Sequence, residues 1–358
     1  MSAFLQRLAA SSPAPGRRRW VLAAYDQLTD RIGPLAGAPP GELGLVLVES
    51  GWKARRRPYH RQKLALLLAS QRHFALEQAA RGVAVRYVTG EGPYRELLEP
   101  VARELGGLVA MEPAERELRA DLAPLVEQGL VELVPHEGWL TDRETFVAAC
   151  GDAPPWRMDA FYREVRRRSG ILMEDGRPVG GKLSFDADNR KAWRGEPPAP
   201  VPPRFRPDGV TKEVGELVER RFARHPGRLD LGTIPASASQ VDRLWRWARS
   251  ECMPHFGPYE DAISTRSRGL FHTRVAPLLN LHRLLPRQVV DDVLALDVPL
   301  QSIEGLVRQV LGWREFVRHV HVATDGFRRL RGMRVGRAKA PGDGGWSRWS
   351  GERWERSR

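Results

Sequence analysis

Short apolar runs alternate with helical patterns over residues 1–150. Residues 60–82 and 113–129 repeat their apolar positions at helical spacing, and each segment ends on a glycine. Other runs are short and almost continuously apolar, which is typical of strands buried on both faces. These runs cover residues 20–25, 43–49, 83–88, 108–112 and 130–135. Strands and helices in this alternation predict a doubly wound parallel sheet.

The carboxyl ends of the first two predicted strands carry polar residues. Tyr25, Asp26 and Gln27 follow the first strand, and Glu49 to Trp52 follow the second. Ligands of doubly wound sheets bind beyond these ends, so we expect the residues to lie near any pocket. Alternatively, they are solvated or cap a helix, as polar residues at strand ends commonly do. The chain carries no dinucleotide fingerprint, Walker loop, zinc-protease helix or nucleophile elbow.

From residue 236 the pattern is helical, without alternating strands. Apolar residues recur at helical spacing in residues 238–256, 272–286, 286–296 and 303–321. Before them, a helical basic segment is followed by a loop rich in Gly, Asp and Asn and by an extended proline-rich stretch; these are residues 158–173, 174–193 and 194–207. The predicted organisation is an α/β domain (1–150), a connector (151–235), the first part of an all-α domain (236–327) and a tail (328–358).

The last predicted helix, 303–321, has two distinct faces. At 100° per residue, one face is apolar and the other carries charge; Leu306, Val310, Trp313, Val317 and Val320 form the first, and Glu304, Arg308, Glu315 and His319 the second. Periodicity favours a helix whose apolar face packs in the core and whose charged face is solvated. If the charged face is covered instead, it forms a polar wall for an anionic or flavin-like ligand.

Composition and charge narrow the class of protein. Lysine and arginine outnumber acids by 57 to 44, giving a net charge of +13. The excess is mostly arginine, which indicates either an arginine-rich proteome or a phosphate-binding surface. Two cysteines, Cys150 and Cys252, cannot supply four thiolates to a cluster. No apolar run suits a signal peptide or a membrane span, so we expect a cytoplasmic, monomeric protein.

Several blocks of the chain resemble the photolyase and cryptochrome superfamily, in its prokaryotic, iron-sulfur branch of deoxyribodipyrimidine photolyase-related proteins. The resemblance covers residues 20–327 and rests on "YDQLTD", "PYHRQKLALLLASQRHFA", "FYREVRRRSGILM", "GGKLSFDADNR", "FGPYEDA", "LFHTRVAPLLN" and "EGLVRQVLGWREFVRH", in that order. It implies an α/β domain able to hold a ribolumazine antenna and a helical domain that holds FAD. It also implies light-driven repair of a pyrimidine dimer or a 6-4 photoproduct flipped out of the duplex.

The resemblance also implies roles for individual residues. Thr273 corresponds to the hydroxyl donor to the flavin phosphates, with His272 and Arg274 alongside. Tyr259, Glu304, Arg308 and Gln309 would lie beside the ribityl chain and ring. Trp313 and Arg314 would face the lesion, Arg318 would face the DNA, and Lys182 would reach toward the damaged strand. In the α/β domain the antenna positions are Asp26, Gln27 and Glu49.

Some features depart from the family pattern. Tyr25 replaces a glycine that precedes the aspartate in relatives, and residues 50–59, "SGWKARRRPY", are basic where a lumazine-binding relative is acidic and aromatic. Antenna binding is therefore doubtful on the sequence.

The tail from residue 328 lacks helical periodicity, and its composition predicts disorder. The cysteines and further helices that relatives carry beyond this point are absent, so we expect a truncated chain without an iron-sulfur cluster and with weak FAD retention. Enzymatic activity then stays open. The alternative is a non-catalytic basic protein that binds DNA or signals blue light.

Overall fold

The computed structural model describes residues 2–330, 333 and 334, which form two compact units. The sheet unit comprises the residues up to Glu137 together with Arg204–Val241. The helical unit comprises Gly138–Pro203 and the described residues from Asp242 onward. The predicted connector, residues 151–235, is thus divided between the two units.

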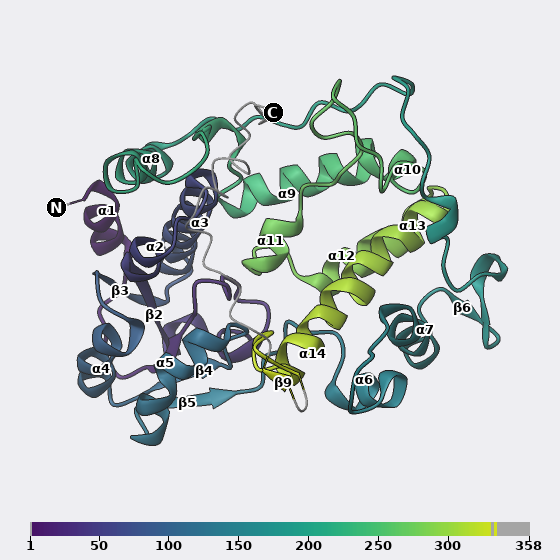
Figure 1. The fold of residues 1–358 in the computed structure, drawn as a ribbon. Coiled ribbons are helices and arrows are strands. Elements are labelled where there is room, and N and C mark those ends of the chain that lie inside the picture. Colours follow the sequence, from purple (N-terminus) through teal and green to yellow (C-terminus); the bar gives the residue numbers. More distant parts are fainter. Residues whose placement is uncertain (1, 331–332, 335–358) are drawn as a thin grey trace, which may run out of the picture. The chain divides into compact units, whose positions relative to one another are not determined.

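A parallel five-stranded sheet forms the centre of the sheet unit (Figure 1). Its order is β3-β2-β1-β4-β5, and the strands are β1 (Arg19–Leu22), β2 (Leu43–Ser50), β3 (Ala84–Gly90), β4 (Leu108–Met111) and β5 (Val131–Val134). In register, Val21 of β1 pairs with Leu45 of β2 and Val109 of β4. All five predicted strands are present within two or three residues of their expected ends, so the doubly wound sheet is confirmed.

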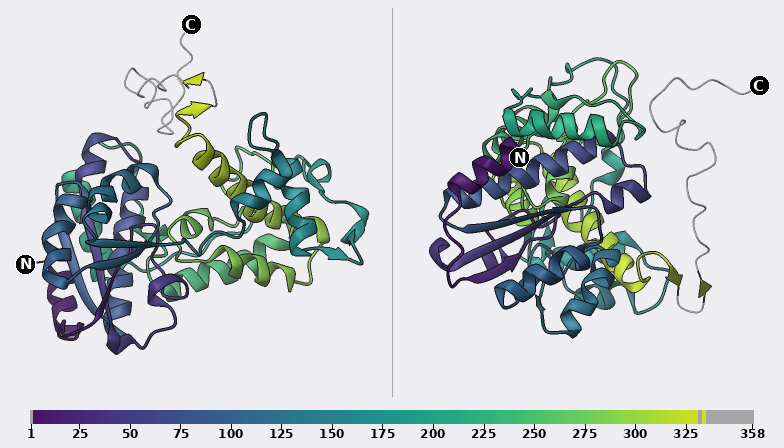
Figure 2. Two further views of the ribbon diagram at one scale, coloured as in Figure 1. Left: turned by 90° about the horizontal axis from the view of Figure 1, so that it is seen from below. Right: turned by 90° about the vertical axis from the view of Figure 1, so that its left-hand side faces the viewer.

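Helices cover both faces of this sheet, as the right-hand view of Figure 2 shows. One face, with Val21 and Leu45, packs against α1 (Ala3–Ser11), α3 (Arg61–Ala80) and α8 (Gly209–Arg221). The other, with Leu22 and Val46, packs against α4 (Tyr94–Leu105) and α5 (Arg116–Glu127). Successive residues of a strand point to opposite faces, and both faces are buried here, which explains the continuous apolar runs.

Some helices of the sheet unit were not predicted. They are α1, α4, α8 and the short α2 (Trp52–Arg56). α8 lies in the predicted connector, where Asp208 caps it by accepting a hydrogen bond from Thr211 N at 2.9 Å. Its apolar positions, such as Val214 and Val218, are few among charged residues, which hid the helical period.

The helical unit is built from short helices and tight turns. Its α-helices are α6 (Arg143–Cys150), α7 (Met158–Ser169), α9 (Ala238–Trp247, which starts in the sheet unit), α10 (Met253–Phe256), α11 (Ala276–Asn280), α12 (Pro286–Leu294), α13 (Leu300–Val307) and α14 (Glu315–Ala323). Two π-helical segments interrupt them, η6 (Ala248–Cys252) and η7 (Arg308–Arg314). The predicted all-α character of this region is confirmed, although two-residue strands form hairpins; these are β6 (Met173–Glu174), β7 (Arg177–Pro178), β8 (Arg329–Leu330) and β9 (Met333–Arg334).

Short 3-10 turns complete the described elements. They are η1 (Gly33–Leu35), η2 (Pro40–Glu42), η3 (Val179–Gly181), η4 (Asp186–Asp188) and η5 (Leu231–Thr233). The proline-rich stretch 194–207 contains no helix or strand, as its composition predicts. Of the predicted disordered tail, residues 331–332 and 335–358 lie outside the described residues. No helix in the described part of the chain is long and apolar enough to cross a bilayer.

The favoured interpretation of residues 303–321 is wrong for the charged face and for part of the apolar face, although Leu306 and Val310 lie in the core as it predicts. Glu304, Arg308, Glu315 and His319 are buried, whereas Trp313 and Val317 are 43% and 46% exposed. The predicted period assumes an unbroken α-helix, but η7 is wound as a π-helix, with more residues in each turn. This wider turn rotates the residues after it relative to those before it, which changes the exposure of Trp313 and Val317. Glu304 and Arg308 come before this change and are buried for another reason, because Phe185, Asp186 and Glu260 cover them.

Candidate functional site

Two predicted flavin-side residues, Arg308 and Gln309, bind a carboxylate that the sequence interpretation missed, and a third lies beside Arg308. The Glu260 carboxylate accepts hydrogen bonds from Arg308 Nη2 at 3.0 and 3.1 Å, and from Gln309 Nε2. Glu304 lies one turn before Arg308, with 3.5 Å between its Oε1 and Arg308 Nε. The α13–η7 helix therefore brings Arg308 and Gln309 to one acidic partner, Glu260, and places Glu304 against Arg308.

The same cluster is closed by residues of the preceding loop. Arg308 Nη1 lies 2.8 Å from Asp186, and the Phe185 backbone N–H donates to Glu304 at 3.0 Å. Asn189 donates from its side-chain amide to Glu260 at 2.9 Å. The block "GGKLSFDADNR" thus ties the 180–190 loop to α13, a role that its loop-like composition did not indicate.

Burial is the main influence on the pKa of the carboxylates in this cluster. Burial raises the pKa of Glu260 and of Glu304, and the adjacent Arg308 guanidinium opposes that rise in pKa. One arginine faces three carboxylates here, two of them almost completely buried. Removing Arg308 would strongly destabilise the fold, because the buried carboxylates would lose the positive charge that compensates them.

The segment 271–274 reaches the same region through Tyr259. The Tyr259 ring stacks on Phe271 with 5.2 Å between centroids, and Tyr259 directly precedes Glu260 in the chain. Tyr259 also donates its hydroxyl to Glu196 O at 3.3 Å. The turn 257–260 therefore contacts the start of the predicted phosphate segment through Phe271.

Within this segment, exposure alternates. Phe271 and Thr273 are buried, whereas His272 and Arg274 are exposed. Arg274 adopts φ +60°, in the left-handed region that non-glycine residues rarely occupy. Backbone in this region costs of the order of 1–3 kcal/mol and is concentrated at ligand-binding segments. The structure thus keeps two cationic or titratable side chains at the surface next to a buried threonine.

The residues present fit FAD in part. An exposed arginine, a histidine and the Thr273 hydroxyl, which makes no hydrogen bond to another described residue, suit phosphate oxygens. The buried side-chain oxygen of Asn189 also lacks a hydrogen-bond partner among the described residues. By contrast, the Gln309 amide nitrogen and both Nη atoms of Arg308 already have protein partners, whereas Arg308 Nε and Glu304 Oε1 are buried without a hydrogen bond among the described residues. The phosphate end of FAD therefore matches free hydrogen-bonding groups, and at the ring end most donors of Arg308 and Gln309 are engaged.

A second buried cluster lies further along the same helix. The Glu315 carboxylate accepts hydrogen bonds from Leu140 N, Thr141 N and Thr141 Oγ1 at 2.8–3.0 Å, and Arg314 Nη1 lies 2.7 Å away. Arg314 also stacks over the Trp139 ring at 4.0 Å. These contacts fasten residues 138–141 to η7 and α14.

Thr141 also links Glu315 to His319. Its hydroxyl lies 2.9 Å from Glu315 Oε2 and 2.9 Å from His319 Nε2. A hydroxyl has one hydrogen and the ionised carboxylate only accepts, so we assign the proton between His319 and Thr141 to His319 Nε2. The His319 ring stacks on Phe146 at 5.0 Å and meets Phe161 edge-on at 5.6 Å. Burial, with Arg318 nearby, lowers the pKa of His319 to about 4.

The predicted lesion-facing residues are not all brought together. Trp313 is exposed and meets Phe316 edge-on at 6.3 Å, whereas its neighbour Arg314 is held inside the Glu315 cluster. Arg318 lies over Trp139 at 4.8 Å. Lys182 is exposed on a different segment, 2.9 Å from Asp188. Arg314 and Arg318 thus share one aromatic support, and Lys182 is not joined to them by any contact within the described chain.

The predicted antenna residues have protein partners in the sheet unit. Glu49 receives a two-pronged hydrogen bond from Arg72 at 2.8 Å and the Tyr87 hydroxyl at 2.6 Å. Gln27 donates to the backbone oxygens of Met111 and Glu112 at 3.2 Å. These two side chains fasten strand ends to neighbouring elements, so, contrary to the alternative, they are neither solvated nor helix caps.

Asp26 lies in a tight acidic and phenolic group. Burial raises the pKa of Asp26 to about 6, with Glu115 adding to the rise in pKa. The Tyr25 hydroxyl donates to Glu115 at 2.6 Å, and Lys53 forms an ion pair with the same carboxylate. Tyr25 therefore occupies space beside Asp26 and is anchored there.

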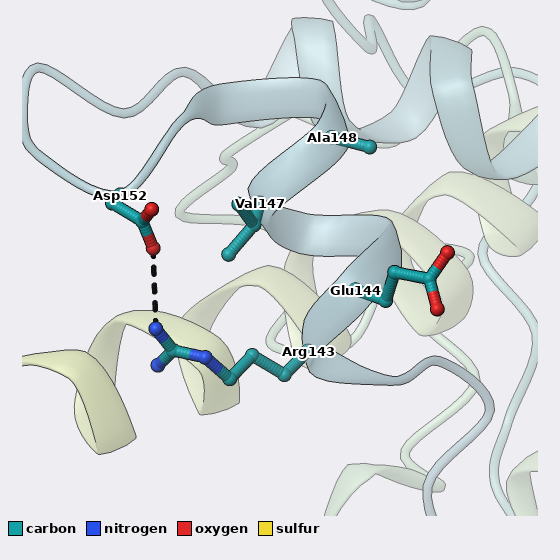
Figure 3. A pocket seen from close by; sticks show the side chains of 5 residues that line it. All are labelled: Arg143, Glu144, Val147, Ala148 and Asp152. Carbon is teal, nitrogen blue, oxygen red and sulfur yellow. Dashed lines mark hydrogen bonds and ion pairs between the residues drawn. The ribbon is translucent and has the colours of Figure 1, made fainter.

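A hollow beside α6 lies apart from the predicted site residues. It has a volume of about 450 Å³ (Figure 3) and is lined by Arg143, Glu144, Val147, Ala148 and Asp152. Arg143 spans it with an ion pair to Asp152 at 3.2 Å, and none of the predicted site residues lines it. Across the residues that the structure describes, no group of three or more His, Cys, Asp or Glu side chains is placed to hold a metal ion.

One family model matches more than half of the chain. Residues 19–232 match the family model described as deoxyribodipyrimidine photo-lyase-related protein. A (6-4) photolyase of Agrobacterium fabrum is 28% identical over 322 residues, covering 84% of this chain. The chain spans 62% of that relative's length. A crystal structure of a bacterial class III photolyase from Agrobacterium tumefaciens aligns with 17% identity and a TM-score of 0.48, over 87% of this chain and 60% of the other.

Proposed function

Because the chain belongs to the deoxyribodipyrimidine photo-lyase-related family, we propose that it is a photolyase-type flavoprotein that repairs UV-damaged DNA in light. The lesion we propose first is the 6-4 photoproduct, since the similar protein of Agrobacterium fabrum is named a (6-4) photolyase. FAD, when bound in its reduced form, supplies an electron on absorbing blue light. Everything else in the proposal concerns residues of this chain.

The observation that carries the proposal is the buried polar wall of the helical unit. Arg308 and Gln309 donate to Glu260, Glu304 lies against Arg308, and the turn that holds Glu260 contacts the segment 271–274 through Tyr259 and Phe271. We propose that Thr273, His272 and Arg274 hold the flavin phosphates and that the wall orients the rest of the cofactor. Because most donors of the wall already have protein partners, FAD should be held chiefly by its phosphates and bind weakly, with a dissociation constant in the micromolar range.

Trp313, Arg318 and Lys182 would contact DNA in this proposal. A base that leaves the stack needs an apolar surface, and the Trp313 indole is exposed next to Phe316. Exposed cations such as Lys182 would bind backbone phosphates. Arg314 is a positioning residue, because its guanidinium is held by Glu315 and Trp139. It would fix the place of Trp313 and Arg318 on either side of it along the helix.

A repair assay tests the proposal. A duplex with one 6-4 photoproduct and another with one pyrimidine dimer are mixed with the chain, excess FAD and a reductant, and each is divided between light and dark. We expect the 6-4 photoproduct to disappear in light only. If lesions persist in light although bound FAD is detected, repair is excluded and the alternative of non-catalytic DNA binding or light signalling takes its place. If Trp313→Ala repairs at the wild-type rate, its contact with the lesion is excluded.

A further inference from the structure

The basic stretch after β2, which departs from the family's antenna pattern, is not used by the proposed flavin or lesion contacts. Residues 52–63, "WKARRRPYHRQK", carry six lysines and arginines and no acid. A second stretch, residues 220–228, "RRFARHPGR", carries four arginines and no acid. Although about 160 residues separate them along the chain, both lie in the sheet unit.

Direct contacts join the two stretches into one surface. Tyr59 N donates to His225 Nδ1 at 3.1 Å, and Arg61 N donates to Pro226 O at 2.9 Å. Arg61 Nε also donates to Gly227 O at 2.7 Å. Gly227 is packed so closely on the His60 ring that no side chain would fit there. We call residues 52–63 and 220–228 together the basic surface; it includes α2 and the end of α8 (Figure 1).

The basic surface is held rigidly from beneath. Ala54 of α2 is buried in the same apolar cluster as Leu64 and Leu68 of α3 and Val214 and Val218 of α8. With Ala54 pointing inward, the charged residues that follow it are directed to solvent, and Arg55, Arg56 and Arg57 are all exposed. These cations are therefore presented by packed elements.

Acidic partners neutralise only part of this charge. Glu91 lies between Arg55 and Arg221, at 2.7 and 2.5 Å, Glu219 pairs with Arg61 at 2.8 Å, and Glu115 pairs with Lys53. The remaining basic side chains have no ion-pair partner among the described residues; they are Arg56, Arg57, Lys63, Arg220, Arg224 and Arg228. Arg57 and Arg224 lie within two residues of the Tyr59–His225 contact, so uncompensated charge collects where the stretches meet.

We propose that the basic surface binds the phosphate backbone of nucleic acid, independently of flavin and of any lesion. Arginine predominates among the unpaired cations, and its planar guanidinium matches phosphate oxygens. An anionic membrane is a poorer match, because interfacial binding also needs apolar side chains to insert. None of the strongly exposed large apolar residues in the described chain belongs to the basic surface. The Trp52 ring is covered by Arg56 at 4.5 Å, which favours contacts to phosphates over stacking with bases.

The test measures binding of an undamaged 20-base-pair duplex in the dark, without added FAD, over a range of salt concentrations. The triple variant Arg56→Gln, Arg57→Gln, Arg224→Gln is compared with Arg7→Gln, Arg17→Gln, Arg19→Gln. The control arginines are exposed on the same unit, without a side-chain partner in the described chain, and their loss changes the net charge equally. Because neither flavin nor damage is present, failure here leaves the proposed repair function untouched, and the reverse also holds.

We expect the first triple variant to bind at least tenfold more weakly at moderate salt. The slope of log affinity against log salt should fall by about 2 to 3, since each phosphate contact contributes about 0.9. The control should keep most of the wild-type affinity and slope. An equal loss of duplex affinity in both triple variants would show that only the net charge matters. Wild-type affinity in the first triple variant would show that the basic surface does not contact DNA. Binding to phosphatidylserine vesicles that is lost in the first triple, without any change in duplex binding, would also overturn the proposal.

Discussion

At the scale of single residues, the main feature of the structure is the burial of polar side chains. Glu304 and Arg308 were expected either at the surface or against a ligand, but they are satisfied largely by Glu260, Asp186 and the Phe185 backbone. The partners could not be predicted, because they lie 44 or more positions away along the chain and carry no spacing signal. Glu260 was within reach, since it directly follows Tyr259, which the sequence singled out.

His319 should make the stability of the protein depend on pH. Its pKa is lowered from 6.5 to about 4 by burial, so the unfolded chain binds more protons between these values. The stabilisation is present above pH 6.5 and is lost as pH falls toward 4, by about 1 to 2 kcal/mol between pH 7 and pH 5. His319→Phe keeps the ring contacts with Phe146 and Phe161 and should lose this dependence.

Urea unfolding at pH 7 and pH 5 measures this difference. His255→Phe is the matched control, because His255 also packs its ring on a phenylalanine, Phe271. The loss of stability between pH 7 and pH 5 should be smaller in His319→Phe than in this control. A His319→Phe variant whose stability falls with pH as steeply as that of the wild type would contradict the lowered pKa.

At the scale of elements, the sequence predicted the strands and helices that have a regular apolar pattern and missed those that do not. All five strands and α3, α5 and α7 follow from apolar spacing and glycine ends. The π-helical turn η7 does not, because its wider turn leaves no mark in an apolar pattern and reverses the exposure of Trp313 and Val317. The helix α8 was missed for a different reason: it has few apolar positions, so its sequence resembles that of a linker.

Gly305 is the point where α13 approaches the Glu260 cluster most closely. A Cβ atom there would lie 2.8 Å from Glu260 Oε2 and 2.9 Å from Asn189 Nδ2. We expect Gly305→Ala to lower the free energy of unfolding by about 1 to 3 kcal/mol, although alanine favours a helix by about 1 kcal/mol. Gly209→Ala, at the start of α8 with open space around it, should change stability by less than about 0.5 kcal/mol. A Gly305→Ala variant as stable as the wild type in denaturant unfolding would show that the cluster yields easily.

At the scale of the whole molecule, the two units carry different parts of the account. The sheet unit has the fold of a ligand-binding domain, but Glu49 and Gln27 serve its own structure, and the basic surface is its exposed feature of interest. The helical unit gathers the buried polar wall and the segment 271–274 around one turn. The resemblance to a family pointed to these residues of the helical unit. The contacts that bring them together could be seen only in the three-dimensional structure.

The central claim, that the helical unit binds flavin through Thr273, is tested most directly by titrating FAD into the full chain and following flavin fluorescence. We expect saturable one-to-one binding in the micromolar range. Thr273→Val should weaken it about 5- to 30-fold, corresponding to roughly 1–2 kcal/mol for a lost hydrogen bond to a charged group, and Thr273→Ser should restore it. Thermal unfolding of each variant checks that the fold is kept. Absence of saturable binding, or equal affinity in folded Thr273→Val and wild type, would contradict the claim.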